Sequence, residues 1–327
     1  MFDDIRRKIR CHRNLRKHIR TMNTYMKGKH DRTAFLKSMI LKNCHSIEKG
    51  FTSRAIRYGF GKEKINLIIS YTNELYILDQ QAYEIKIAIA VLKFYLEQHK
   101  AANYQSEEFD ALSAEISRLL SGLPDVNISG GVIELNVNEC DNSFDAFEKL
   151  VKSRHSIRSF KNEKVDENII VKSIQTAMLA PSACNRQTTR AYVVDRSDFD
   201  KLKGWDAGVK TFLDQVDKII IITGQMSAYN GDEFFQYAVS AGIFTAYLTL
   251  AFHAQGIGCC ILERPLYSNE LWERIKRDLG IPENEQSICA VAIGVPMEKQ
   301  KVPVSARLPY EIIAKHVGEY YKTKKGN

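Results

Sequence analysis

The chain has 327 residues, of which 44% are hydrophobic, and a formal net charge of +8. This length and composition predict about two domains with a buried core, which excludes a disordered or fibrous chain. The charge is uneven, because residues 1–60 contain 16 Lys and Arg against 4 Asp and Glu, whereas residues 61–327 contain 31 against 35. The basic character therefore belongs to the N-terminal arm.

Seven cysteines are scattered along the chain, and none forms a C-x-x-C pair. An odd number at irregular spacing, with no signal peptide expected, argues against a disulfide framework and against a zinc site. We therefore expect a cytoplasmic protein with reduced cysteines and no bound metal. They are Cys11, Cys44, Cys140, Cys184, Cys259, Cys260 and Cys289.

Residues 3–27 predict an amphipathic helix with an apolar side and a basic side. Helices of this kind bind membrane surfaces or nucleic acid, or dock on the protein body with the basic face in solvent. No stacking aromatics interleave with the charges, so we expect no nucleic-acid partner. Docking on the body is the favoured reading, and peripheral membrane contact stays open. The apolar side carries Ile5, Ile9, Leu15, Ile19, Met22 and Met26.

Further helices are predicted from Asp31 to His45, over 62–79, over 81–98 and from Ser106 to Leu120, by apolar spacing and N-capping residues. Gly and Pro then punctuate 122–141, where alternation around residues 133–137 predicts a short strand at the edge of the next sheet. We expect a basic helical region over 1–125, a connector over 126–140 and a second domain over 141–327.

The second domain predicts a mixture of helices and strands. A helix begins at Phe144, Asp166 caps the next, and β-branched runs predict strands over 189–194, 219–223 and 288–293. Long helices follow at 232–255 and 268–279. With no G-x-G-x-x-G after a strand, this order favours an α+β sandwich over a Rossmann domain.

The run 234–252 contains no charged residue and approaches the length that spans a bilayer. It carries Gln, Ser, Thr and Gly and is flanked by Glu233 and His253. We therefore expect a helix buried in a core or a subunit interface, and no transmembrane segment.

Two clusters of polar side chains flank the helix that Asp166 caps. The first holds Arg154, His155, Ser156 and Arg158, whose guanidinium groups and hydroxyl suit a phosphate. The second runs from Pro181 to Gln187 and presents hydroxyl and amide groups that can bind the edge of a polar ring. The polar members of the second cluster are Ser182, Asn185 and Gln187. The two clusters together suit a phosphorylated heterocycle.

Five motifs in the same order resemble those of the nitroreductase family of FMN enzymes. They are R-H-S-I-R-S-F, A-P-S-A-C-N-R-Q, G-I-G-C-C-I-L-E, A-I-G-V-P and A-R-L-P, within residues 144–317. The resemblance implies a three-layer α+β sandwich with a mixed, mostly antiparallel sheet, and a homodimer with FMN at its interface. The N-terminal motifs H-S-I-E-K-G-F and R-Y-G-F-G-K resemble nitroreductase-like proteins found with polysaccharide-synthesis genes.

The resemblance also implies roles for individual residues. Arg154, Ser156 and Arg158 would hold the FMN phosphate and the N1/O2 edge of the ring, with the backbone of His155, and Arg158 would stabilise negative charge on the reduced ring. Arg307 would complete the phosphate site, with Ser305 or Lys301. The remaining implied contacts are Pro181, Ser182, Asn185 and Gln187 at the ring edge and ribityl chain, and Leu262 and Glu263 near flavin N5.

The implied activity is that of an oxidoreductase which takes hydride from NAD(P)H and passes electrons to a nitroaromatic, quinone-like or other conjugated acceptor by a ping-pong mechanism. The alternative is a flavin-binding or degenerate scaffold whose helical region docks a protein or a membrane. Thr188 and Thr189 stand where the family often has proline and an aromatic residue. The variable stretch 205–235 carries Trp205, Tyr229, Phe234 and Phe235, either as a substrate pocket or as core.

Overall fold

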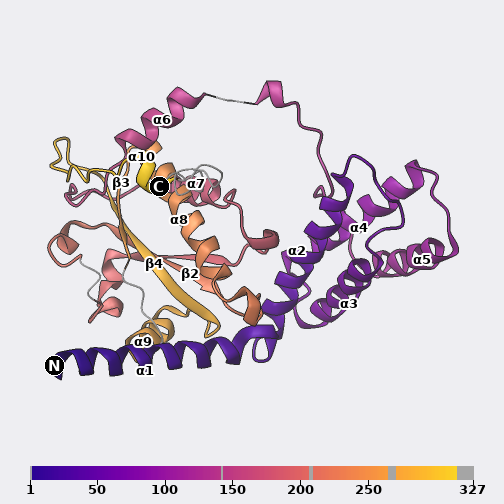
Figure 1. Cartoon of the computed structure of the whole chain (residues 1–327), viewed down its shortest axis with the longest axis horizontal. Coiled ribbons are helices and arrows are strands. Elements are labelled where there is room, and N and C mark those ends of the chain that lie inside the picture. Colours follow the sequence, from indigo (N-terminus) through magenta and orange to yellow (C-terminus); the bar gives the residue numbers. More distant parts are fainter. Residues whose placement is uncertain (1, 141–142, 206–208, 264–269, 315–327) are drawn as a thin grey trace, which may run out of the picture.

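The computed structural model describes residues 2–140, 143–205, 209–263 and 270–314. Figure 1 shows a C-terminal domain built on a central sheet, a separate bundle of helices beside it, and one long helix that lies along the outside of the C-terminal domain. The helices predicted for the N-terminal third are all present, but they divide between these two bodies.

Helix α1 (Phe2–Tyr25) packs on the C-terminal domain through its last two turns. Met22 and Met26 are buried there against Met226, Tyr229 and Tyr237. The chain then turns through Lys27 and Gly28, which both have positive φ angles, of 62° and 68°. A Cβ at Gly28 would lie 2.4 Å from Cβ of Phe35, so this turn requires glycine.

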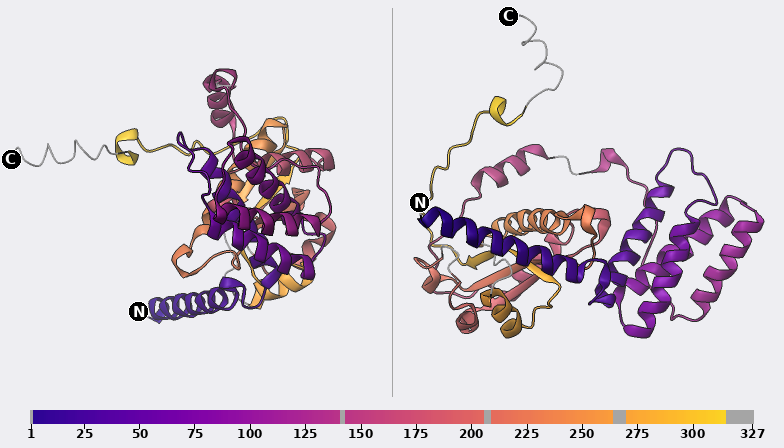
Figure 2. Two further views of the ribbon diagram at one scale, coloured as in Figure 1. Left: turned by 90° about the vertical axis from the view of Figure 1, so that its right-hand side faces the viewer. Right: turned by 60° about the horizontal axis from the view of Figure 1, so that its bottom comes forward.

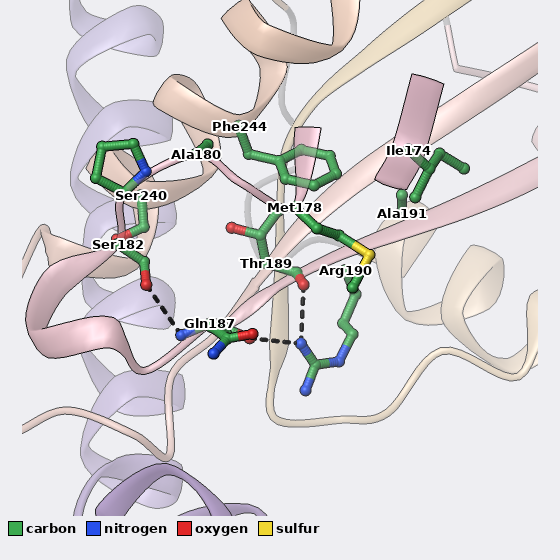
Figure 3. Close-up of a pocket in the computed structure, with 11 residues that line it drawn as sticks. Ile174, Met178, Ala180, Ser182, Gln187, Thr189, Arg190, Ala191, Ser240 and Phe244 are labelled. Atoms are coloured by element: carbon green, nitrogen blue, oxygen red, sulfur yellow. Dashed lines mark hydrogen bonds between the residues drawn. The ribbon is translucent and has the colours of Figure 1, made fainter. Parts of the chain in front are cut away.

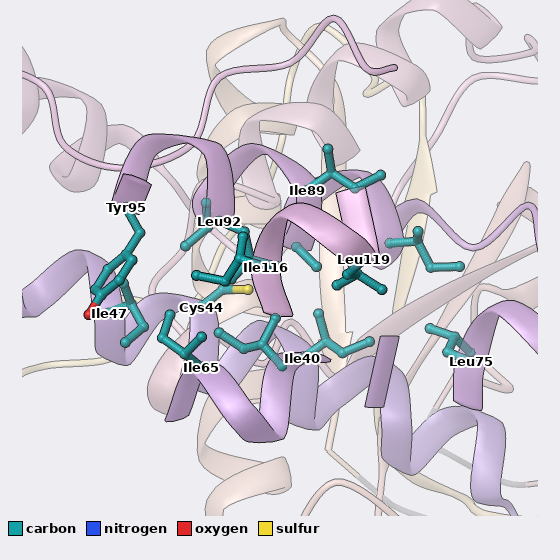
Figure 4. Packing of buried hydrophobic residues seen from close by; sticks show 14 of the residues in the cluster. Ile40, Cys44, Ile47, Ile65, Leu75, Ile89, Leu92, Tyr95, Ile116 and Leu119 are labelled. Atoms are coloured by element: carbon teal, nitrogen blue, oxygen red, sulfur yellow. The ribbon is translucent and has the colours of Figure 1, made fainter. Parts of the chain in front are cut away.

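The bundle comprises α2 (Arg32–Phe51), α3 (Lys62–Leu78), α4 (Tyr83–Ala101) and α5 (Glu107–Ser121). Asp31 and Ser106 cap α2 and α5 by accepting from the backbone N–H of Ala34 and Phe109. Aliphatic side chains from all four helices form its core, as Figure 4 shows. The fully buried members include Leu36, Ile40, Ile65, Ile68, Leu75, Ala88, Val91, Leu92, Tyr95 and Ile116.

The buried side chain of His99 connects α4 to the loop between α2 and α3 at one end of the bundle. Its Nε2 accepts from the backbone N–H of Gly59 at 2.8 Å, and its Nδ1 lies 2.8 Å from the carbonyl oxygen of Tyr95. These two bonds define a neutral imidazole with the proton on Nδ1. The R-Y-G-F-G-K segment therefore serves to fix the loop between α2 and α3. Aromatic rings surround the imidazole: Phe51, Tyr58, Phe60, Tyr104 and Phe109.

The connector contradicts one prediction. Residues 133–137 form no strand, and Ile133, Leu135 and Val137 are exposed at 87%, 68% and 67%. The connector's fixed point is Gly130, where a Cβ would lie 2.7 Å from the backbone nitrogen of Val91. Alternation alone was misleading because no neighbouring strand pairs with this segment.

The sheet of the C-terminal domain has four strands in the order β1-β2-β4-β3, all paired antiparallel. Its helices form layers on both faces, since α7 and α8 pack with the core of one face and α9 with the core of the other. The predicted α+β sandwich is confirmed. The strands are β1 (Thr189–Asp195), β2 (Lys218–Gln225), β3 (Gly258–Leu262) and β4 (Glu285–Gly294). The helices are α6 (Phe144–Ser153), α7 (Glu167–Ala177), α8 (Gln236–Ala254), α9 (Glu270–Leu279) and α10 (Tyr310–Ile313).

Helix α8 is the predicted uncharged helix, and by length and composition alone the stretch Gly231–Ala254 could cross a membrane. One side of α8 packs on the sheet and on α7 through Ala241, Phe244, Leu248 and Phe252. The other side leaves Phe235, Val239 and Tyr247 exposed to between 41% and 67%. The helix therefore has one core face and one apolar outer face.

The residues that follow β4 run away from the body, as both views in Figure 2 show for 301–314. This tail ends the described part with α10. Its apolar side chains are exposed: Val304, Leu308, Ile312 and Ile313.

Candidate functional site

Arginine side chains from two distant segments line one cavity of about 470 Å³. The first polar cluster supplies Arg154, His155, Ser156 and Arg158, and the tail supplies Ser305 and Arg307. Lys152 adds a further cation, and no carboxylate of the described residues lines the cavity. A set of three guanidinium groups, an ammonium and two hydroxyls is suited to a phosphate group.

Backbone pairing fixes the first cluster to the sheet. Ser156 forms a parallel bridge with Cys259, and the N–H of Ile157 donates to the carbonyl oxygen of Cys259 at 2.9 Å. The cluster therefore lies where β3 begins and β4 ends. The guanidinium of Arg158 donates back to the carbonyl oxygen of Ser156 at 3.4 Å, and that of Arg307 donates to the carbonyl oxygen of Ser305.

Two titratable groups border this cavity. His253, near the end of α8, lies with Nε2 2.8 Å from the hydroxyl of Ser153. Burial and the neighbouring charges of Arg154 and His155 lower its pKa, which keeps the imidazole neutral. Cys259 is buried, and burial raises the pKa of its thiol to about 12. Cys259 and Cys260 are both buried, at 2% and 3% exposed, as small apolar side chains usually are.

The second polar cluster lines a different cavity, of about 250 Å³. Figure 3 shows Ser182 and Gln187 at its mouth and Phe244 and Ile174 in its apolar wall. The hydroxyl of Ser182 accepts from the N–H of Gln187 at 3.1 Å. The guanidinium of Arg190 donates to the carbonyl oxygen of Gln187 at 2.7 Å, which fixes the loop to the start of β1.

The backbone of this loop is strained. Cys184, Asn185 and Gln187 all have positive φ angles, of 53°, 54° and 50°. Residues without glycine's freedom hold such angles only where the surroundings impose them. The buried side chain of Arg186, between them, supplies part of that constraint.

Arg186 is 1% exposed, and its guanidinium lies over the ring of Tyr229, 4.7 Å from the centroid. It pairs with Glu233, which also approaches Lys42 of α2 at 4.0 Å. Although burial alone raises the pKa of Glu233, the hydrogen bond and charge of Arg186 hold it below its ordinary value. Helix α2 packs against residues 183–185. The helical bundle is therefore in direct contact with the loop of the second cluster.

The two clusters of one chain lie at opposite ends of the sheet. Ser156 bridges Cys259, which pairs with Ile293, whereas Thr189 pairs with Gly224, which pairs with Gln286. The seven steps from Gln286 to Ile293 span about 24 Å of strand. The clusters of one chain therefore line separate cavities.

Some predicted residues lie outside both cavities. Asn185 is exposed and accepts from the amide of Gln187 at 3.3 Å, and Lys301 does not line the arginine cavity. Leu262 is buried at the end of β3 and Glu263 follows it, exposed. Of the aromatic residues in 205–235, Trp205 and Tyr229 are core and Phe235 is exposed on α8.

Among the polar residues of the cavities, sequence reasoning missed Lys152, Arg190 and Ser240. Lys152 lies two residues before Arg154, and Arg190 lies three residues after Gln187, so both basic residues were visible near the motifs. Ser240 was hidden in the uncharged helix, yet its hydroxyl accepts from the N–H of Ala183 at 3.2 Å. No local pattern in the sequence indicates that contact.

The fold and the arginine cavity define a class: an α+β sandwich with an anion site at a strand end. A model of the nitroreductase family matches residues 151–207 and 200–295. An NADH dehydrogenase/NAD(P)H nitroreductase of Archaeoglobus fulgidus is 29% identical over 155 residues, which cover 46% of this chain and 86% of that protein.

Solved structures show the same kind of likeness. A nitroreductase of Desulfovibrio desulfuricans in complex with FMN is 21% identical, with a TM-score of 0.43, over 52% of this chain and 95% of that chain. An FMN-dependent nitroreductase of Clostridium difficile is 26% identical, with a TM-score of 0.41, over 50% of this chain and 94% of that chain. The match to the nitroreductase family therefore lies within the C-terminal domain, and the helical bundle precedes it.

Proposed function

We propose that this chain is an FMN-dependent oxidoreductase that works as a homodimer. NAD(P)H is the electron donor, and a nitroaromatic, quinone-like or other conjugated small molecule is the acceptor. The observation that carries the proposal is the cavity in which Arg154, Arg158 and Arg307 converge, with no carboxylate from the part of the chain that the structure describes. The match to the nitroreductase family and the name of the Archaeoglobus fulgidus relative support the reaction class.

The residues present fit FMN by their spacing along the sheet. Glu263 follows Cys259 by four residues, about 13 Å of strand, which leaves room for an extended group between the arginines and Glu263. The amide loop of the same chain lies about 11 Å further along the strands, and at β1 it is three strands away from β3, so it is too far to bind the same ring. A second copy of the chain would supply Pro181, Ser182, Asn185 and Gln187 to it.

Exposed apolar faces support the dimer. The outer face of α8 continues into α6, where Phe144, Phe147 and Val151 are exposed at 68%, 55% and 43%. The tail that carries Arg307 is exposed as well. Apolar surfaces of this size mark protein interfaces, and dimerisation would bury them beside the proposed site.

FMN, when bound, supplies the redox chemistry. Arg154 and Arg307 would neutralise the phosphate, and Ser156 and Ser305 would add hydroxyl groups. Arg158 would stabilise negative charge at the N1/O2 edge. Leu262 and Glu263 would hold the N5 side in place, and the amide loop would orient the ring from the second chain. The apolar wall of the loop cavity, with Phe244 and Ile174, would exclude water from one side.

The first experiment is to purify the protein, record its visible spectrum, identify the released cofactor and follow NAD(P)H oxidation with a quinone or nitroaromatic acceptor. A flavin spectrum with FMN released and acceptor-dependent turnover is expected. Absence of both after reconstitution with FMN would refute the proposal.

The dimeric site is tested by co-expressing two inactive variants. One is Arg154→Gln with Arg307→Gln, and the other is Ser182→Ala with Gln187→Ala. If each site takes one cluster from each chain, mixed dimers contain one intact site, and about a quarter of the wild-type turnover returns. No recovery, with mixed dimers shown to form, would mean that one chain supplies both clusters.

A further inference from the structure

The outer part of α1 has no part in the proposed reaction. Residues 5–20 contain eight Arg and Lys and no Asp or Glu. Arg13, Arg16 and Arg20 are exposed and form no ion pair with any residue that the structure describes. The positive charges of these three arginines repel one another. Their arrangement is therefore costly unless an anionic partner is present.

Apolar side chains are exposed on the same part of the helix. Ile5, Ile9 and Leu15 are exposed at 48%, 63% and 50%, and Ile19 at 38%. Wound at about 100° per residue, these four side chains fall within an arc of about 120°. The contact of α1 with the C-terminal domain is made by His18, Met22 and Met26. On the same projection these residues fall on the side of Leu15 and Ile19, so Ile5 and Ile9 point furthest from that domain.

The arginines border this apolar arc. On the same helical projection, Arg16 falls within the arc and Arg13 and Arg20 lie beside its edge. This combination is the pattern of a helix that lies in a membrane interface, where apolar side chains enter the acyl boundary and long basic side chains reach the headgroups. The helix lies along the outside of the C-terminal domain in both figures that show the whole chain.

We propose that α1 binds the surface of an anionic phospholipid bilayer, with Ile5 and Ile9 in the interface and the arginines on the headgroups. The helix then holds the oxidoreductase at the membrane while His18, Met22 and Met26 keep it attached to the C-terminal domain. This proposal is independent of the flavin chemistry.

Charge complementarity favours a bilayer over the other occupants of such a face. Nucleic acid would neutralise the arginines but would leave the isoleucines in water, and the segment from Asp3 to Thr24 contains no Phe, Tyr or Trp to stack on bases. A second copy of α1 would cover the isoleucines but would place two clusters of eight cations side by side.

The test is co-sedimentation of the full-length protein with vesicles of phosphatidylcholine alone and with 30% phosphatidylglycerol. One variant carries Arg13→Gln, Arg16→Gln and Arg20→Gln, and a second carries Ile5→Ser and Ile9→Ser. A matched control removes three exposed cations from the bundle with Arg54→Gln, Arg57→Gln and Arg118→Gln. Duplex DNA and the oligomeric state in solution are measured with the same set.

Wild-type protein is expected to bind only the anionic vesicles. The arginine variant should weaken binding about a hundredfold, the isoleucine variant at least tenfold, and the control variant severalfold at most. The proposal fails if wild type does not bind, if the control loses as much as the arginine variant, or if binding ignores the isoleucines while duplex DNA binds through the arginines. It also fails if the isoleucine variant changes the oligomeric state.

Discussion

Replacing Arg186 by methionine should loosen the loop of the second cluster without touching either cavity directly. Methionine keeps most of the buried apolar volume. It removes the positive charge that pairs with Glu233 and the contact with the ring of Tyr229. Because Arg186 lies between Asn185 and Gln187, the loss falls on a backbone held at positive φ angles. The variant should therefore lower both the stability of the domain and its affinity for FMN.

The expected coupling free energy between Arg186 and Glu233 depends on how deeply the two side chains are buried. Removing one partner of a fully buried ion pair costs about 3–5 kcal/mol, whereas an exposed pair contributes at most about 1 kcal/mol. The side chain of Arg186 is fully buried, but that of Glu233 is 26% exposed. We therefore expect a coupling free energy of about 2 kcal/mol in a double-mutant cycle of Arg186→Met and Glu233→Gln. Lys42→Met, whose pair with Glu233 is longer and partly exposed, should show a coupling below about 0.5 kcal/mol.

The assay is urea unfolding followed by tryptophan fluorescence. The two tryptophans of the chain, Trp205 and Trp272, both lie in the core of the C-terminal domain, so their signal reports that domain and not the bundle. A coupling between Arg186 and Glu233 no larger than that of Lys42 would refute the reasoning. A large coupling free energy combined with an unchanged affinity for FMN would also refute the reasoning.

Other predictions concern both domains. Arg154→Gln and Arg307→Gln should each weaken FMN binding at least tenfold, measured by fluorescence titration, because each removes a charged hydrogen bond. Burial lowers the pKa of His99 below its ordinary value of 6.5, despite the opposing bond to a backbone carbonyl. The unfolded chain then takes up a proton first, so bundle stability should be full above about pH 7 and fall below it. His99→Gln should remove that pH dependence in circular dichroism melts. Gly50→Ala should destabilise the bundle by over about 2 kcal/mol despite better helix propensity, because the new Cβ would lie 2.0 Å from the ring of Phe60.

Helix positions were predictable because apolar spacing and capping residues are local signals. Asp166 illustrates this, since its carboxylate accepts from the N–H of Asn168 at 2.7 Å as the first turn requires. The strand at 133–137 failed because alternation indicates a strand only where a partner strand exists. Strand β3 was missed because it has only five residues and directly follows the glycine turn that ends α8.

The candidate site was predictable as residue types but not as geometry. The motifs indicated Arg154 and Arg307 together, and the structure brings them into one cavity. The separation of the two clusters depends on strand order, which no local pattern contains. The contact between α2 and the amide loop depends on how two bodies pack, so the bundle's position beside the site also could not be foreseen.

Because α1 docks on the C-terminal domain, the helical bundle is inserted between two segments of that body, α1 and α6. The polypeptide leaves that domain at Met26, passes through α2 to α5 and returns at α6. A protease cut in the connector would therefore not release the bundle, because α1 still holds the N-terminal fragment. The two fragments should stay together after nicking and separate only under denaturing conditions.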